Sequence, residues 1–501
     1  MKSETSVKTT ERLEWGDINW KKVERRLFRL QKRIYKASKR GDFKAVRYLQ
    51  KLLLKSWSAK VLAVRSVTQD NQGKNTAGVD GVKSLCSQAR INLVGQLTLG
   101  AKPKPTHRVD STETVVNAPS RNGEQTIFCR AGQGLVRLAL EPEWEAKFES
   151  NCYGFRPGRS CHDAIKAISN HLESEPKWVL DTQITKCLSD RINGDRLLDK
   201  LGTFPKLRRQ IRAWLKSGVM DGKQLFPTKE GTPPGGLIQP LLAHIALHGI
   251  EEDILKMADQ LSGREPVNRH QLCLIRYADK LVILHQDAAV IHHSQQVIRE
   301  WLKPWGLELK PEQTRIAHTL DGEDAGFDFL GFHIQQYRVG KYHSGKDRKG
   351  KSLGFKTIIK PSRNAVTEHY KLLARVIDAH QAAPQAALIR RLNRIILRWS
   401  NYYSTVVSKE VLNKLDYLLF GKLRRWANRR HPHQSEKWVA NKYWQSIDNR
   451  NWAFAVRGHE EIALFKHSQI HIFRYVKGKE AASAEDGNLS YGSTANCGNY
   501  Q

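Results

Sequence analysis

The stretch LIRYADKLVIL, residues 274–284, sets a carboxylate and an ammonium side by side between two short apolar segments. The apolar segments predict the two strands of a hairpin, with Asp279 and Lys280 at its polar tip. A carboxylate at a hairpin tip offers oxygen ligands to a hard divalent cation, but the lysine ammonium competes for that carboxylate and repels the cation. A metal site, the remains of one and an ordinary charged turn are therefore three open interpretations of this hairpin.

Positive charge is the dominant compositional feature of the chain, whose 501 residues carry a formal net charge of +33. An excess of Lys and Arg this large predicts a polyanionic partner, for which nucleic acid is the usual choice. The excess lies in two blocks, with 16 basic and two acidic residues over 21–65, and 23 basic and six acidic residues over 341–445. Two separated blocks indicate a long or folded-back ligand, whose affinity falls steeply as the salt concentration rises.

The cysteines and the hydropathy pattern indicate the environment of the protein. The seven cysteines include no CxxC pair, so structural zinc and a disulfide framework are not expected. Their pattern instead predicts a reducing compartment. No apolar run reaches the roughly 18 residues of a membrane span, and the polar N-terminus lacks the core of a signal peptide. These features predict a soluble intracellular protein with no membrane partner.

Apolar periodicity changes along the chain and predicts different kinds of structure. Two helices, broken at KRGD (39–42), are expected over residues 20–66, and a mixed α/β pattern follows to about residue 340. The predicted strands of the mixed part are KWVLDTQI, LIRYA, LVILH and FDFLGFHI. The sequence beyond it is helical, with two apolar stripes that we interpret as core rather than as base-stacking platforms. They are Ile389, Leu392, Ile396, Trp399 and Tyr403 in one stripe, and Val411, Leu415, Leu418 and Trp426 in the other.

Several stretches fall in a recognisable order along the chain. They are TAGVDG (76–81), YGFRPGRSCHDAI (153–165), VLDTQITKCLSDRIN (179–193), GTPPGGLIQPLLAHIALHGIE (231–251), RYADKLVIL (276–284) and GFDFLGFHI (326–334). They resemble the successive motifs of group II intron-encoded reverse transcriptases, and LRRWANRRHP (423–432) resembles the maturase, or X, region of that family. The resemblance implies an α/β (α+β) right-hand reverse-transcriptase fold of fingers and palm, followed by an α-helical thumb or maturase domain.

The resemblance extends over roughly residues 20–470 and, with the composition, predicts a division into segments. They are a basic helical N-terminal extension (1–70), reverse-transcriptase-like fingers and palm (71–340), a basic linker (341–355), a helical thumb or maturase domain (356–455) and a short, partly disordered tail (456–501). The zinc-dependent HNH endonuclease that many family members carry is not expected, because the chain lacks its paired cysteines.

The departures from the family pattern concern the polymerase chemistry. Nucleotidyl transfer needs two divalent ions held by carboxylates, which the family supplies from a DADI-type strand and a YADD hairpin. These strings are DTQI and YADK here, so an amide and an ammonium replace two of the carboxylates. We therefore expect no intact catalytic set and no metal site beyond a weak contribution of Asp279. The degenerate palm positions are Asp181, Gln183, Asp279 and Lys280.

Further departures affect neighbouring motifs. CLSDRIN fits the family only with one extra residue, and Pro234 replaces the glutamine of a TPQGG loop near the incoming nucleotide. Ser120 and Thr126 stand where active members use Lys and Arg to hold the triphosphate. In contrast, Gly154 and Gly331 keep their places in the structural motifs. We therefore expect a retained fold without the polymerase chemistry.

Both basic blocks resemble the surfaces with which the family grips intron RNA, the first on a stem-loop and the second on the catalytic core. RNA bound in this way is recognised through phosphates, 2′-hydroxyls and shape, so no catalytic residue is needed. The candidate contacts at the N-terminal end are Lys21, Lys22, Arg25, Arg26, Arg29, Lys32, Arg33, Lys36 and Arg40. Those of the thumb are Arg390, Arg391, Arg394, Arg398, Lys422, Arg424, Arg425, Arg429, Arg430 and Lys437.

These features predict a group II intron maturase that binds intron RNA and assists its folding and splicing, in the bacterial cytoplasm or an organelle. The protein then requires no cofactor, and Mg²⁺ belongs to the intron ribozyme. Three alternatives stay open, namely an active RNA-directed DNA polymerase of a mobile intron, a non-functional remnant and a general RNA-binding protein. Weak binding to DNA and the choice between monomer and homodimer are open as well.

Overall fold

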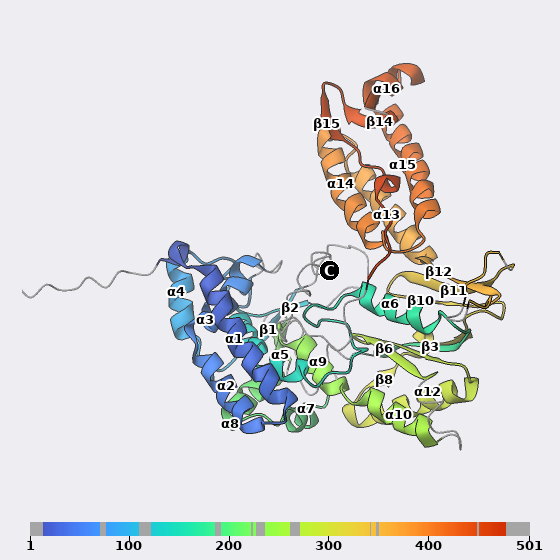
Figure 1. Cartoon of the computed structure of the whole chain (residues 1–501). Helices are drawn as coiled ribbons and strands as arrows, with labels where there is room; N and C mark the ends of the chain where they lie inside the picture. The colour runs from blue at the N-terminus through green and yellow to red at the C-terminus, as the bar shows by residue number, and fades with distance from the viewer. Residues whose placement is uncertain are drawn as a thin grey trace, which may run out of the picture.

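The computed structural model describes residues 14–70, 77–109, 122–185, 192–221, 224–226, 236–260, 271–340, 342–346, 350–447 and 450–476. N-terminal helices stand on one side of a central sheet, and a helical column rises above the opposite end of that sheet (Figure 1). This is the right-hand arrangement of fingers, palm and thumb that the sequence predicts. Among the described residues, no helix is both long enough and apolar enough to cross a bilayer.

The N-terminal extension contains one helix more than the two that the sequence predicts. Its helices are α1 (Trp20–Lys39), α2 (Phe43–Lys55) and α3 (Trp57–Arg65). The predicted break at KRGD is confirmed, and the carboxylate of Asp42 caps α2 by accepting from the amide of Ala45. The prediction missed the break at Ser56, where an extended backbone ends α2 without the help of Gly or Pro.

The central helix of the fingers is α5 (Ile127–Glu145), against which α1, α2 and α3 pack. Val23, Leu27 and Ile34 form the buried face of α1, as their helical spacing predicts. The remaining finger elements are α4 (Ser87–Gln96) and a sheet of order β2-β1-β4-β5, with β1 (Thr106–Val109), β2 (Asn122–Glu124), β4 (Val219–Asp221) and β5 (Gln224–Phe226).

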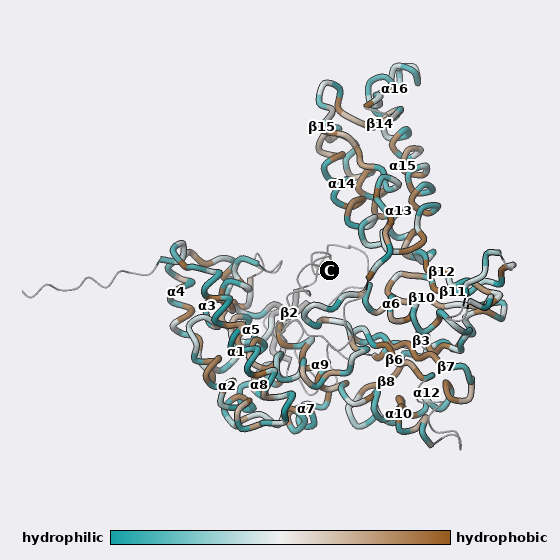
Figure 2. Tube along the Cα trace, viewed as in Figure 1, coloured by the Kyte–Doolittle hydropathy of each residue, from teal (hydrophilic) through white to brown (hydrophobic). Residues whose placement is uncertain are grey.

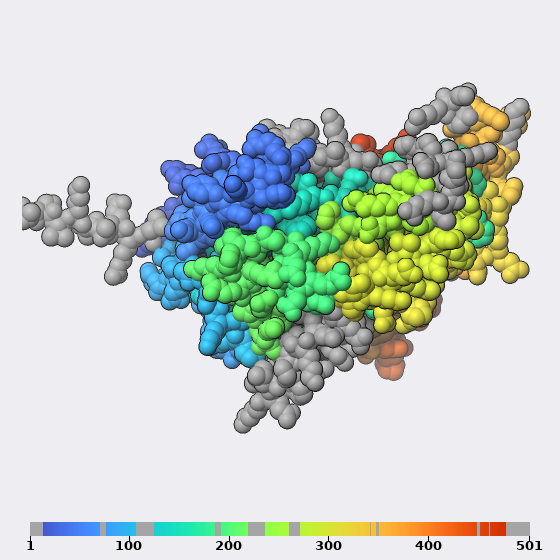
Figure 3. All heavy atoms as spheres, turned by 90° about the horizontal axis from the view of Figure 1, so that it is seen from below, coloured from blue at the N-terminus to red at the C-terminus, as the bar shows by residue number. Residues whose placement is uncertain are grey.

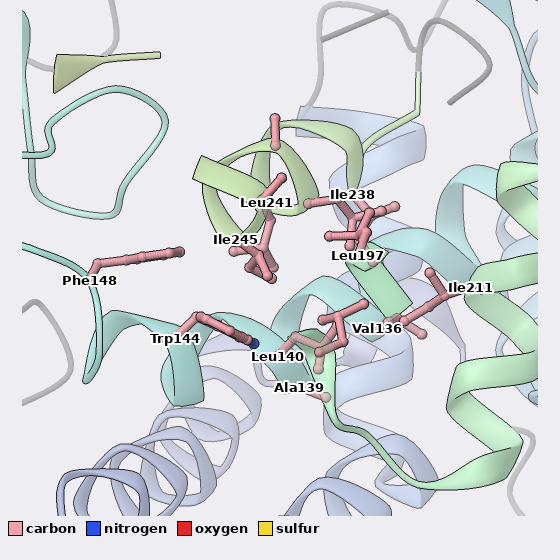
Figure 4. Close-up of a cluster of buried hydrophobic side chains, with 14 of the residues drawn as sticks. Val136, Ala139, Leu140, Trp144, Phe148, Leu197, Ile211, Ile238, Leu241 and Ile245 are labelled. Carbon is pink, nitrogen blue, oxygen red and sulfur yellow. The ribbon is translucent and has the colours of Figure 1, made fainter. Parts of the chain in front are cut away.

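A continuous core joins the fingers to the palm. Its helices include α7 (Gly194–Leu201), α8 (Pro205–Leu215) and α9 (Gln239–Leu247). Figure 4 shows their side chains converging on α5, with the labelled residues Val136, Ala139, Leu140, Trp144, Phe148, Leu197, Ile211, Ile238, Leu241 and Ile245. Full burial of each large side chain contributes about 1.5–3 kcal/mol, so this core fixes the fingers on the palm.

The palm sheet has the strand order β6-β7-β3-β8, with β9 also paired to β3. Its strands are β3 (Trp178–Thr185), β6 (Cys273–Tyr277), β7 (Lys280–His285), β8 (Glu308–Leu309) and β9 (Arg315–His318). The strands predicted from KWVLDTQI, LIRYA and LVILH are confirmed, and apolar residues run along them (Figure 2). Leu180 and Ile283 belong to the core shared with α10 (Ile250–Gln260) and α12 (Ala288–Leu302). Val179 and Val282 belong to a second core, shared with α6 (Cys161–His171).

A second sheet lies between palm and thumb and has the order β10-β11-β12. Its strands are β10 (Phe327–Phe329), β11 (Phe332–Arg338) and β12 (Phe355–Pro361). β10 and β11 confirm the FDFLGFHI prediction. The linker predicted over 341–355 joins two neighbouring strands of one sheet, because Phe332 pairs with Pro361 and Arg338 pairs with Phe355. The structure after residue 355 therefore starts with a strand, and the first helix begins only at Arg363.

The thumb is built from α13 (Arg363–Ala379), α14 (Gln385–Tyr402), α15 (Lys409–Arg430) and α16 (Glu436–Tyr443). The interpretation of its apolar stripes as core is confirmed for the stripe on α14, where Leu392 and Ile396 are fully buried. The α15 stripe is confirmed at Leu415 and Trp426, which are buried, whereas Val411 and Leu418 are half-buried and their neighbours Leu412 and Leu419 take the buried positions.

A three-stranded sheet that the sequence analysis missed completes the thumb. Its strands are β13 (Trp444–Ile447), β14 (Arg450–Val456) and β15 (His459–Ala463). The boundary predicted between residues 455 and 456 falls inside β14, and the start of the predicted tail (456–501) contains β15 and a short 3₁₀ helix, η6 (His467–Gln469). The polar end of the tail, from residue 477, lies outside the described residues.

Candidate palm centre and nucleic-acid interface

The four palm positions singled out by the sequence lie on two paired strands and the turn between them. In the antiparallel pairing of β3 with β7, Gln183 stands opposite Lys280 and Asp181 stands opposite Val282. Gln183 Nε2 donates to Asp279 Oδ2 over 2.6 Å. Because residues two apart share a face of a strand, Asp181 lies on the same face as Gln183. The structure thus brings all four positions to one place.

The hairpin tip depends on a glycine of another motif. Ala278, in the turn before Asp279, has a φ of 57°, a conformation that disfavours a side chain. A Cβ on Gly154 would lie 2.5 Å from the backbone nitrogen of Ala278, so only glycine fits beside this turn. The Ile184 amide donates to the Asp279 carbonyl over 2.8 Å and fastens the tip to β3. The YGFRPG loop therefore positions the hairpin.

Burial controls the electrostatics of Asp181. Burial raises the pKa of this carboxyl to about 6, with a smaller contribution from nearby Asp328, while Lys280 and Arg315 act in the opposite direction. Asp328 itself lies 2.7 Å from Nδ1 of His333, whose pKa is raised chiefly by this hydrogen bond. The Lys280 ammonium therefore competes with any cation for the charge of Asp181.

The donor set does not fit the pair of divalent ions that nucleotidyl transfer uses. Such a centre requires carboxylates from two palm elements, whereas Gln183 supplies a neutral amide and Lys280 an ammonium. Within the described ranges, no group of three or more His, Cys, Asp or Glu residues is placed to hold a metal ion. The arrangement can position backbone and side chains, but we assign no metal-dependent step to it.

The other departures from the polymerase motifs are partly visible. The hydroxyl of Thr126 accepts from the Cys129 amide over 3.2 Å and caps α5, which is a structural role. Ser120, Pro234 and the altered part of CLSDRIN (187–190) lie outside the described residues.

The basic residues predicted at the N-terminal end lie on α1, and all but Arg40, its C-cap, are within the helix. They are exposed except for Lys32, which is half-buried, and they occupy the faces of α1 that do not pack on α5. In the described part of the chain, no side-chain hydrogen bond or ion pair engages any of them. This set is Lys21, Lys22, Arg25, Arg26, Arg29, Lys32, Arg33, Lys36 and Arg40. Their charge is therefore available to an external ligand.

The structure divides the predicted thumb residues into two groups. Three of them serve the fold, because Lys422 pairs with Asp378 at 2.8 Å, Arg424 pairs with Glu436, and Arg430 donates to the carbonyl oxygens of Gln381 and Ala383. The others are exposed and make no side-chain hydrogen bond or ion pair to any described residue. They are Arg390, Arg391, Arg394, Arg398, Arg425, Arg429 and Lys437.

Two of the free arginines share a hollow. Arg425 and Arg429, one turn apart on α15, line a space of about 270 Å³ together with Trp426 and the loop after α13. Arg430 covers the ring of Trp426, with its guanidinium carbon 4.7 Å from the ring centroid. The hollow therefore offers two guanidinium groups that make no ion pair with a described carboxylate, which suits a phosphate.

A larger cavity, of about 570 Å³, lies where palm and thumb meet, and sequence reasoning missed it. Tyr402 of α14 and the C-terminal Tyr475 line it with residues of the YGFRPGRS loop. The hydroxyl of Tyr475 donates to Asp163 Oδ1 over 3.0 Å and lies 3.2 Å from the Ser160 hydroxyl. Tyr402 donates to the Leu330 carbonyl over 2.9 Å. No local sequence signal connects Tyr475 to α6, because the contact is long-range.

Comparison with protein families gives three matches in the order of the domains. "N-terminal domain of reverse transcriptase" matches residues 15–97, "Reverse transcriptase (RNA-dependent DNA polymerase)" matches 123–334, and "Group II intron, maturase-specific domain" matches 366–444. The first match covers α1 to α4, the second contains the palm hairpin, and the third lies on the thumb.

Curated relatives point to the same group of proteins. Maturase-like protein 1 of Euglena longa is 36% identical over 338 residues, which are 64% of this chain and 66% of that protein. Protein YkfC of Escherichia coli (strain K12) is 27% identical over 344 residues, 58% of this chain and 84% of that protein. Group II intron-encoded protein LtrA of Lactococcus lactis subsp. cremoris is 29% identical over 201 residues, 39% of this chain and 33% of LtrA. The chain thus spans only part of each relative.

Proposed function

Because the chain belongs to the family of group II intron-encoded reverse transcriptases and maturases, we propose that it is a maturase, which binds the RNA of a group II intron and assists its folding and splicing. The RNA supplies the transesterification chemistry and its own Mg²⁺ ions, so the protein requires no cofactor. Its place of action is where the intron is spliced, in the bacterial cytoplasm or an organelle.

The observation that carries this proposal is the unpaired positive charge on two separate surfaces. The basic side chains of α1 and seven of those predicted on the thumb make no side-chain hydrogen bond or ion pair to the described part of the protein. A net charge of +33 leaves too few carboxylates to neutralise them. Folded RNA, with a phosphate at every nucleotide, is a partner long enough to engage both surfaces at once.

The palm geometry supports a maturase that works without polymerase activity. Asp279 already accepts a hydrogen bond from Gln183, and Lys280 adds an ammonium at the same place. On this proposal the palm is a scaffold that holds fingers and thumb at a fixed spacing for RNA. Contacts with RNA then need only basic and aromatic side chains.

An active RNA-directed DNA polymerase is the second candidate, because the reverse-transcriptase description matches residues 123–334. Primer extension on an RNA template, with Mg²⁺ or Mn²⁺, separates the two. We expect no cDNA above that of a heat-inactivated sample. Sustained cDNA synthesis would overturn the scaffold role of the palm.

Splicing of the intron transcript that carries the coding sequence tests the proposal directly. We expect purified protein, at one molecule per RNA, to accelerate splicing at a Mg²⁺ concentration too low for the RNA alone. The Arg425→Glu/Arg429→Glu variant should lose this effect, and an unrelated structured RNA should bind more weakly. No acceleration, together with weak and salt-insensitive binding, would favour a remnant over a maturase. Equal binding to every RNA would favour a general RNA-binding protein.

A further inference from the structure

A hollow lined by basic and aromatic side chains lies on the underside of the fingers, away from the thumb. It is formed by α2, the region following α5 and the C-terminal end of α7, and its volume is about 650 Å³. Figure 3 shows this underside, where the N-terminal helices (blue) border α7 and α8 (green). None of its lining residues is among the RNA contacts that the sequence predicts.

The floor of the hollow is rigidly built around Arg47. This side chain pairs with Glu143 Oε2 of α5 at 2.6 Å and donates to the Gly202 carbonyl after α7 over 2.9 Å. Lys147 pairs with the other oxygen of Glu143 at 2.8 Å. These bonds connect the three elements, so Arg47 and Lys147 hold fixed positions before any ligand binds.

The charge of the hollow is strongly positive. Its lining includes Lys44, Arg47, Lys51 and Lys147. Lys200 lines it as well, but its ammonium donates to the carbonyl oxygens of Ala246 and His248. Glu143 is the carboxylate that pairs with two of these side chains, whereas Lys44 and Lys51 make no hydrogen bond or ion pair to any described carboxylate. A surface with this charge attracts anions, and its affinity for them depends on salt.

Exposed aromatic rings distinguish this hollow from a merely basic surface. Tyr48 is 65% exposed and Phe43 is 56% exposed, although rings of this size usually bury most of their area. Lys44, Tyr48 and Lys51 follow one another at i, i+4 and i+7, so they share one face of α2. The Lys51 ammonium lies 5.2 Å from the centroid of the Phe204 ring, so aromatic and cationic groups are neighbours here. A helix face with a ring between two lysines matches the alternation of base and phosphate along a single strand.

We propose that this hollow binds a single-stranded stretch of RNA, with an unpaired base stacked on Tyr48 and the neighbouring phosphates against Lys44 and Lys51. Double-stranded RNA does not fit this role, because pairing hides the faces of its bases. The inference rests on the proposed function for the identity of the RNA as the intron's own. It adds a further face to the N-terminal basic block (21–65), on the opposite side of the molecule from the thumb, so that RNA can be held on both sides.

The test measures binding of the full-length protein to a fluorescent uridine dodecamer over a range of KCl concentrations. We expect Tyr48→Ala to weaken binding about five- to tenfold without changing the salt slope, since stacking carries no charge. Tyr48→Phe should bind like the native chain. Lys44→Glu/Lys51→Glu should weaken binding and also reduce the salt slope by roughly one unit, as loss of two phosphate contacts on a single strand predicts.

Matched controls use features of the same kind elsewhere on the protein. Tyr417→Ala removes a ring that is 78% exposed on α15. Arg299→Glu/Lys303→Glu reverses two exposed charges at the C-terminal end of α12. Neither should weaken binding of the dodecamer as strongly as the substitutions in the hollow. Thermal unfolding of every variant checks that the fold is intact.

The inference is wrong if Tyr48→Ala binds the dodecamer like the native chain. It is also wrong if a polyglutamate peptide competes as well as the dodecamer, because the hollow would then be a general site for acidic chains. Its failure is distinguishable from failure of the maturase proposal. If native and Tyr48→Ala protein accelerate splicing alike and bind the dodecamer equally, only the proposal for the hollow is wrong. If Tyr48→Ala weakens dodecamer binding but the native protein does not accelerate splicing, only the maturase proposal is wrong.

Discussion

Asp279 is the carboxylate that remains in the palm hairpin, and Gln183 donates a hydrogen bond to it from a neutral amide. A two-metal centre would need a carboxylate at the position of Gln183. The 2.6 Å bond from its amide to Asp279 satisfies that carboxylate within the protein. Lys280, opposite Gln183 on the paired strand, adds positive charge. A dication would have to displace one group and approach the other, and both steps oppose binding.

The Gln183→Asp/Lys280→Asp variant should gain affinity for Mn²⁺ that the native chain lacks. Clustered carboxylates repel one another, so we expect the metal-free variant to lose about 1–3 kcal/mol of stability and to regain it with Mn²⁺. The unfolding temperature with and without Mn²⁺ measures this. Gln183→Leu is the control, because it removes the hydrogen bond without adding charge and should not respond to Mn²⁺. Equal responses of all three proteins would contradict the prediction.

Buried histidines make the stability of the thumb depend on pH. The ring of His369 stacks on Trp399 with centroids 4.5 Å apart, and its Nε2 lies 2.9 Å from Nε2 of His467. Burial, and to a smaller extent the charge of His467, lowers the pKa of His369 to about 3. His467 in turn contacts Asp416 of α15 at 2.8 Å. Protonation of His369 would therefore place a positive charge inside a packed cluster.

The sign of the pH effect follows from the depressed pKa. The unfolded chain takes up a proton near pH 6.5, well before the folded chain does, so stability is complete above that pH and falls as the pH drops toward 3. We expect a loss of about 2 kcal/mol at pH 5 from His369 alone. Urea unfolding at pH 7.5 and pH 5 measures it. His369→Gln should reduce the difference between the two pH values, and an undiminished difference would point to other groups.

At the scale of elements, a close backbone approach positions the tip of the palm hairpin, whereas buried side chains pack its two strands into the cores. Gly154 reaches the turn at Ala278 so closely that no Cβ has room. Gly154→Ala should therefore displace the turn at Ala278 and destabilise the protein by about 1–3 kcal/mol. Thermal unfolding measures the loss. Gly421→Ala, in the middle of α15 with no atom near its Cβ position, is the control and should be neutral or slightly stabilising.

Helix α15 carries neighbouring arginines with different tasks. Arg425→Ala/Arg429→Ala should weaken binding of intron RNA and lower the salt slope without changing the unfolding temperature, because neither side chain bonds to the described protein. Arg430→Ala should instead reduce the stability by about 0.5–1.5 kcal/mol and so lower the unfolding temperature, since it removes the hydrogen bonds to the carbonyl oxygens of Gln381 and Ala383. Filter binding and thermal unfolding on both variants separate these tasks. The reverse assignment of effects would contradict the division.

At the scale of the whole molecule, the C-terminal segment ties the thumb back to the palm. The segment begins after η6. The Phe473 amide donates to the Ser404 carbonyl over 3.0 Å, and the Tyr475 hydroxyl then donates to Asp163 of α6. Figure 1 shows this segment descending from the thumb toward α6. The spacing between palm and thumb, and with it the distance between RNA surfaces, depends partly on these contacts.

Tyr475→Phe should loosen this connection, because it removes the hydrogen bonds to Asp163 and Ser160. We expect a loss of about 1 kcal/mol of stability and faster chymotrypsin cleavage near Phe473. Tyr417→Phe, which alters an exposed tyrosine of the thumb, should change neither. Identical cleavage rates for native and Tyr475→Phe protein would show that the hydroxyl does not hold the segment.

The sequence by itself determined the local elements and the overall class of fold. β3, β6, β7, β10 and β11 follow from alternating or continuous apolar runs between turns, and the buried face of α1 follows from its 3.6-residue period, because these signals are local. The motif order carried the resemblance to the right-hand fold and located the palm centre. The break at Ser56 and the strands β13 to β15 were missed, since no Gly or Pro marks the first and packing on α14 stabilises the others.

The tertiary structure alone decided which charged residues are free and which contacts join distant segments. Arg424 and Arg425 are adjacent in sequence and alike in chemistry, but only Arg424 points to Glu436, which reaches it because α16 folds back on α15. Gln183 and Asp279, and likewise Tyr475 and Asp163, meet through packing of elements far apart in the chain. The basic hollow beside α2 also exists only because α5 and α7 close around it. Such contacts depend on how faces are paired in space, which a local pattern does not encode.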